Sequence, residues 1–194
     1  MLICCCSGCK KGSPSVVGTM PNSEIVPLSI GNRWFQHCQL YDSSGNVFSS
    51  WPDSICVLGD SVIGNTSWFL LEMQGLEYEV NNQQGGLWSL GEGGQFLWYK
   101  YPAEKGDSFL VSTNTSFVRV CSVDTMITVK AGTFSCYRYE FDIPPWSGAI
   151  GGARSVEFLS PDHGFIEKEF YQSTFTSSRQ YLYSRVELNL LGLK

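Results

Sequence analysis

The chain has 194 residues, a length that fits one domain with a hydrophobic core of its own. Charged residues make up 16% of the chain and hydrophobic residues 43%, a balance that excludes an intrinsically disordered protein. Thirteen basic and 18 acidic side chains give a net charge of -5 without a basic cluster, so nucleic acid is not an expected partner.

The chain begins with an apolar, cysteine-rich stretch that is typical of the end of an export signal. Residues 1–9 end in Ser7, Gly8 and Cys9, a pattern that resembles a bacterial lipobox, in which the cysteine carries a diacylglycerol after cleavage. Cys9 is therefore the predicted lipid anchor, and Met1 is predicted to lie inside a longer signal peptide. The alternatives are an unprocessed tail and a redox or zinc pair formed by Cys6 and Cys9.

Residues 10–24 are rich in Gly, Ser, Pro, Asn and Thr, which predicts a flexible tether. No later run approaches the ~18 apolar residues of a membrane-spanning helix. The sequence thus predicts a domain over residues 25–194 whose contact with the membrane is made through the lipid anchor, on the periplasmic or the surface face of the cell envelope.

Residues 25–194 are predicted to form an all-β domain. Only four alanines accompany 20 glycines, a composition that disfavours helices, and short runs alternate apolar with polar residues between turn signals. Val118–Val129 and Thr133–Asp142 flank the turn residues Ala131 and Gly132, with Tyr137, Tyr139 and Phe141 on one face of the second arm. We expect a single curved antiparallel sheet, a half-barrel of about nine to eleven strands.

Six tryptophans are many for this length and indicate either a ligand surface or a filled core. We take Trp88, Trp98 and Trp146 as candidate ligand-binding residues. Trp146 lies in a proline- and glycine-rich segment, 143–153, that is expected to be a loop, serving as a lid or plugging the core.

Four cysteines, Cys38, Cys56, Cys121 and Cys136, could form two disulfides or remain buried thiols. A two-residue turn at Ala131 and Gly132 would place Cys136 opposite Ile127, which does not favour a bridge to Cys121.

Catalytic signals are weak, and we predict no cofactor, no metal and no enzymatic activity. The sequence has no G-x-S-x-G motif and no metal-ligand spacing. Cys136, His163 and Asp162 could be assembled on paper as a triad. The alternative of a hydrolase rests on strand-face carboxylates, which are Glu77, Glu79, Glu167 and Glu169.

Four segments together resemble a family of uncharacterised envelope lipoproteins common in Bacteroidetes. They are Pro27–Trp34 (PLSIGNRW), Tyr101–Asp107 (YPAEKGD), Val129–Tyr139 (VKAGTFSCYRY) and Pro161–Lys168 (PDHGFIEK). The third departs from the family pattern at Lys130, where proline is usual. The resemblance implies a half-barrel similar to the periplasmic lipoprotein-localisation factors and carries no catalytic residues.

The sequence therefore predicts a non-enzymatic, lipid-anchored cell-envelope protein whose half-barrel binds an apolar ligand or another envelope component. A structural surface lipoprotein without a ligand is the second alternative.

Overall fold

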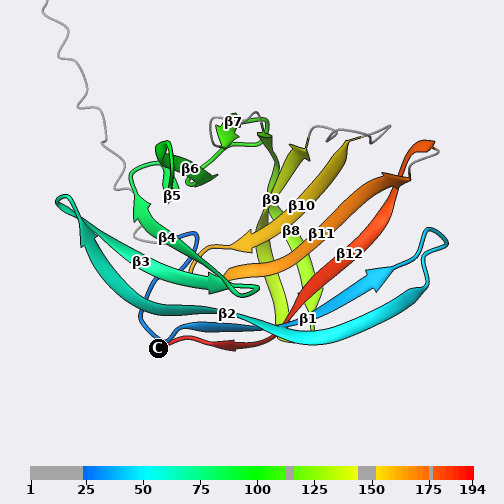
Figure 1. Cartoon of the computed structure of the whole chain (residues 1–194), viewed down its shortest axis with the longest axis horizontal. Coiled ribbons are helices and arrows are strands. Elements are labelled where there is room, and N and C mark those ends of the chain that lie inside the picture. The colour runs from blue at the N-terminus through cyan, green and yellow to red at the C-terminus, as the bar shows by residue number, and fades with distance from the viewer. Residues whose placement is uncertain (1–23, 112–115, 144–151, 175–176) are drawn as a thin grey trace, which may run out of the picture.

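The computed structural model describes residues 24–111, 116–143, 152–174 and 177–194, and their strands form one antiparallel sheet (Figure 1). The strands are β1 (Arg33–Tyr41), β2 (Val47–Ile63), β3 (Thr66–Met73), β4 (Leu76–Gln83), β5 (Gly86–Gly91), β6 (Gly94–Lys100), β7 (Ser108–Val111), β8 (Ser116–Val129), β9 (Gly132–Ile143), β10 (Ala153–Ser160), β11 (Gly164–Thr174) and β12 (Ser177–Gly192). The all-β prediction is confirmed.

The predicted number of strands is wrong, because the described residues form twelve rather than nine to eleven. Strands of four to seven residues, such as β5, β6 and β7, carry too few alternating positions to be counted separately from the sequence. The Gly91–Gly94 stretch is the tight turn that separates two of them.

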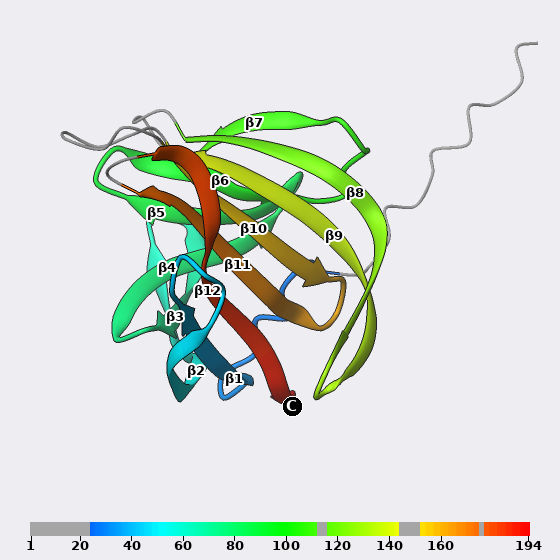
Figure 2. The same cartoon turned by 90° about the vertical axis from the view of Figure 1, so that its right-hand side faces the viewer.

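The sheet consists of two meanders, β1 to β6 and β7 to β12, joined where β1 pairs with β12. The edge strands β6 and β7 follow one another in the chain, so the sheet nearly closes into a barrel (Figure 2). Side chains reach across the remaining gap. The Tyr139 hydroxyl on β9 donates to the backbone carbonyl of Lys100 on β6 at 2.8 Å, and the rings of Tyr101 and Tyr137 lie 5.3 Å apart.

Alternation along β1 shows which face is inside the curve. Trp34, Gln36 and Cys38 are buried, whereas Arg33 and Phe35 are exposed. The inner face carries the large aromatic side chains Trp34, Tyr99 and Tyr139, all almost fully buried. Because Tyr99 on β6 packs edge-on against Tyr139 at 5.2 Å, residues far apart in the sheet meet inside the barrel.

The segment that precedes β1 is tied to several strands. The Val26 carbonyl accepts a hydrogen bond from the Asn82 amide at 2.7 Å, and the Glu24 carbonyl accepts from the backbone N–H of Asp162 at 2.7 Å. Ile25 and Val26 are fully buried. This segment therefore belongs to the folded domain and contributes to its core.

The β8–β9 hairpin differs from its predicted register. Val129 pairs with Gly132, which puts the turn at Lys130 and Ala131, one residue earlier than expected. The pairing is regular from this turn to Thr125, so Cys136 lies opposite Thr125 instead of Ile127. An irregularity between Ser122 and Thr125 shifts only the pairs farther from the turn. All four cysteines of the described domain are free, Cys38, Cys56 and Cys136 being buried.

Candidate functional site

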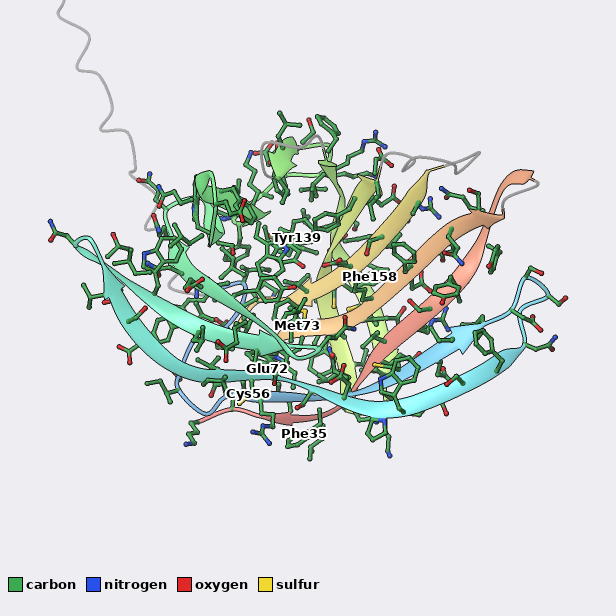
Figure 3. All side chains as sticks on the ribbon, viewed as in Figure 1. Phe35, Cys56, Glu72, Met73, Tyr139 and Phe158 are labelled. Atoms are coloured by element: carbon green, nitrogen blue, oxygen red, sulfur yellow. The ribbon has the colours of Figure 1, made fainter. Side chains whose placement is uncertain are left out.

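A pocket of about 70 Å³ opens on the inner face of the sheet. A water molecule needs roughly 10–15 Å³ on this measure, so the space would hold about five waters. Met73 from the end of β3 lies inside the curve of the sheet, where Figure 3 labels it. The lining residues are Gln36, Ile55, Met73, Gln74, Trp98, Tyr99, Glu157, Leu159, Phe165, Glu167, Lys168 and Val186.

The pocket has a charged centre on β10 and β11, in which the carboxylate of Glu157 is buried and the side chain of Lys168 is 45% exposed. Glu157, which is 7% exposed, accepts hydrogen bonds at one carboxylate oxygen from the Ser155 hydroxyl at 2.9 Å and from the Lys168 ammonium at 3.0 Å. Its other oxygen accepts from the Tyr99 hydroxyl. Every strong interaction of this carboxylate is thus made with the protein itself.

Electrostatics keep this centre as an ion pair. Burial by itself raises the pKa of Glu157, but the positive charge of Lys168 and the hydrogen bonds from Tyr99 and Ser155 outweigh it, so the pKa is lowered. The charge of Glu157 in turn raises the pKa of Lys168. Burial, followed by the charge of Glu157, raises the pKa of Tyr99 well above its ordinary value, which keeps it a neutral donor.

Gln36 on β1 supplies a second polar group. It is 8% exposed and lies on the inner face between Leu188 of β12 and Asp53 of β2. Its side-chain amide lines the pocket and has no hydrogen-bond partner among the described residues. The amide is therefore open to the pocket, where it can bond to water or to a polar group of a ligand.

A β-bulge turns Trp98 toward the pocket. Leu87 pairs with Tyr99 and Trp88 pairs with Leu97, which leaves Trp98 as the extra residue of β6. Its ring stacks on Tyr99 at 5.6 Å, with an interplanar angle of 16°, and lines the pocket.

Of the predicted ligand-binding tryptophans, only Trp98 is found in this wall. Trp88 is not among the lining residues. Trp146 and the predicted anchor Cys9 lie outside the described residues.

The sequence reasoning missed Gln36, Glu157 and Lys168. One signal was available for Glu157, which stands between Val156 and Phe158 in a strand where nearly every residue proves to be buried. A lone carboxylate in such a run needs a partner, which here comes from the neighbouring strand.

Glu167 belongs to the opposite face of β11. Adjacent residues of a strand point to opposite faces, and the register puts Glu167 beside Glu187 of β12, away from Lys168. Burial raises its pKa to about 7, against the opposing effect of Arg185 and with a further contribution from Glu169 and Glu187.

The carboxylates considered for a hydrolase do not converge on the pocket. Glu77 pairs across the sheet with Glu72, and Glu79 with Leu70. Of the four candidate carboxylates, only Glu167 borders the pocket.

The structure does not assemble Cys136, His163 and Asp162 into a catalytic triad. Burial, followed by the charge of Glu167, raises the pKa of the Cys136 thiol to about 12. The His163 ring nitrogen Nδ1 lies 2.9 Å from the carbonyl oxygen of Pro161, and the Asp162 carboxylate accepts from the backbone N–H of Glu24. Each member is thus engaged elsewhere, and Cys136 is held as a thiol rather than as a thiolate nucleophile.

In the part of the chain that the structure describes, no group of three or more His, Cys, Asp or Glu side chains is placed to hold a metal ion. The same residues contain no helix long and apolar enough to cross a membrane.

Comparison with known proteins gives structural neighbours only. No family model and no curated protein matches the chain. One similar structure is a candidate lipoprotein from Parabacteroides distasonis, 15% identical with a TM-score of 0.47, covering 88% of this chain and 99% of its own. Another is a candidate exported protein with a YmcC-like fold from Bacteroides fragilis, 11% identical with a TM-score of 0.48, covering 88% of this chain and 100% of its own.

Proposed function

We propose that the protein is an exported, lipid-anchored envelope protein that holds a small ligand inside its curved sheet and acts by binding rather than by catalysis. The interior pocket carries the proposal, because it combines an apolar wall with the Glu157–Lys168 pair and the unpartnered Gln36 amide. The lipobox-like pattern at Ser7, Gly8 and Cys9 supports the anchor.

The chemistry of the pocket favours binding. Glu157 has all its strong interactions with protein groups, so it has no free oxygen with which to act as a base. Glu167 points away from Lys168 and Glu157, so a pair of carboxylates facing one substrate, as glycoside hydrolysis needs, is not formed.

The alternative hypothesis, a purely structural lipoprotein, is supported by the part of the barrel that side chains fill. Trp34, Tyr99 and Tyr139 occupy much of the interior, and the pocket is small for a whole lipid. The two hypotheses differ in whether the exported protein carries a bound molecule in this pocket.

Native mass spectrometry of protein produced with export in bacteria tests the binding. We expect a retained small mass in the unaltered protein and its loss in Val186→Phe, which places a large ring in the pocket. Leu190→Phe, on the same strand but 60% exposed, is the matched control and keeps the mass. A bare protein mass throughout would favour the structural rival.

Metabolic labelling with a fatty-acid analogue tests the anchor. We expect incorporation in the unaltered protein and in Cys6→Ser, and none in Cys9→Ser. Label that persists in Cys9→Ser would rule out this anchor.

A further inference from the structure

The pocket also indicates what kind of group it accepts. Resting on the proposed binding function, we infer that the ligand enters with a neutral end group that both donates and accepts hydrogen bonds, a carboxamide or a hydroxyl, carried on an aliphatic chain.

The charges around the pocket disfavour an ionic end group of either sign. An anion would compete with Glu157 for Lys168, and so leave two carboxylates, one of them only 7% exposed, against one ammonium. Asp53, opposite Gln36 on β2, adds a further negative charge nearby. A cation would meet the Lys168 ammonium, while Glu157 is already occupied by Tyr99, Ser155 and Lys168.

Hydrogen bonding favours a group with both a donor and an acceptor. The Gln36 amide offers an N–H₂ donor and a carbonyl acceptor, neither of which has a partner among the described residues. A carboxamide or a hydroxyl satisfies both sides of this amide at once. A purely apolar ligand would leave it unpaired and desolvated, which is costly.

Shape and lining indicate an aliphatic chain behind that end group. Ile55, Met73, Leu159 and Val186 line the same space as Gln36. Since about 70 Å³ admits only a few non-hydrogen atoms, the end group and the first carbons enter and the rest of the ligand extends toward the opening.

The test uses four probes that share a six-carbon chain: hexanamide, 1-hexanol, hexanoate and hexylamine. Methyl NMR of the protein labelled at methionine and isoleucine reports binding through Met73 and Ile55, both in the pocket wall. We expect the neutral probes to shift these methyls with Kd on the order of a millimolar, as ligands of this size allow, and the charged probes to bind at least about tenfold more weakly.

A variant pair locates the hydrogen bond. Gln36→Met keeps the side chain unbranched and is expected to weaken hexanamide binding about tenfold. Gln39→Met, on the outer-facing part of the same strand beside Arg185, is expected to leave it unchanged. If Gln36→Met fails to fold, the ranking of the four probes on the unaltered protein still decides.

Equal or tighter binding of hexanoate or hexylamine would overturn the inference but leave a ligand pocket in place. Failure of all four probes to shift the pocket methyls would also overturn it. Retained mass in the native spectrum would then still support the proposed function, and its absence would reject both.

Discussion

The two faces of strands β9 to β12 use the same kinds of charged residue in different ways. On the inner face a single pair, Glu157 and Lys168, lies in a pocket beside the aromatic core. On the outer face ion pairs follow one another across the strands, with Arg138 and Arg154 at Glu140, and Arg185 at Glu169 and Glu187.

The outer network acts as a cover. Val156 and Phe158 point outward from β10, yet they are only 1% and 7% exposed. Val156 is flanked across the sheet by Glu140 and Glu169, and Phe158 by Arg138 and Glu167, so long charged side chains border both apolar residues on this face.

The inner pair covers nothing. It costs desolvation and requires Tyr99 and Ser155 to complete its hydrogen bonds, where an aliphatic pair would fill the space more simply. This contrast supports a binding role for the inner face and a protective role for the outer one.

The largest effect is expected from Glu157→Gln. The substitution removes the charge opposite Lys168 and weakens the bonds from Tyr99 and Ser155, so the free energy of unfolding in urea should fall by about 2–4 kcal/mol. Glu169→Gln is the matched outer variant and should cost about 1 kcal/mol. Equal losses of unfolding free energy in the two variants would contradict the proposed difference between the inner and outer faces.

The double variant Glu157→Leu with Lys168→Met tests whether the fold needs the ion pair or only the balance of its charges. Because it removes both charges together, its stability should return to within about 1–2 kcal/mol of the unaltered protein, better than either single change. A loss equal to the sum of the singles, in the same urea experiment, would mean that the pair is needed for the fold itself.

Removing one tyrosine hydroxyl from each face should change the free energy of unfolding by smaller amounts. Tyr139→Phe loses the inner bond to the Lys100 carbonyl and should cost about 1–1.5 kcal/mol. Tyr171→Phe loses the outer bond to Glu169 but keeps its ring beneath Arg154, and should cost about 0.5 kcal/mol. Thermal unfolding measures both, and the reverse order would contradict the comparison.

The smallest expected change in the free energy of unfolding is the pH-dependent contribution of Glu167. Its folded pKa of about 7 lies above the ordinary value of 4.5, so its contribution to stability is fully present below about pH 4.5 and is lost as the pH rises through 7. Glu167→Gln should therefore raise the free energy of unfolding by about 1 kcal/mol at pH 8 and leave it unchanged at pH 4. Glu92→Gln, in the exposed β5–β6 turn, should show no such pH dependence.

The sequence predicted which residues are buried in those strands that have one solvent-exposed face. Tyr139 and Phe141 are buried on the inner face of β9 as their alternation with charged residues predicted. The site was hidden because it depends on closure of the sheet. Tyr99 and Glu157 are 58 residues apart and meet only when β6 approaches β10 across the barrel. No local pattern reports the bulge that turns Trp98 inward or the lack of a partner for Gln36.

A high-resolution crystal structure of the protein purified after export would show whether the pocket holds a ligand. We expect density for a non-protein group in the pocket, within hydrogen-bond distance of the Gln36 amide and clear of the intact Glu157–Lys168 pair. A closed pocket in which Gln36 bonds to Asp53 or another protein group would contradict it.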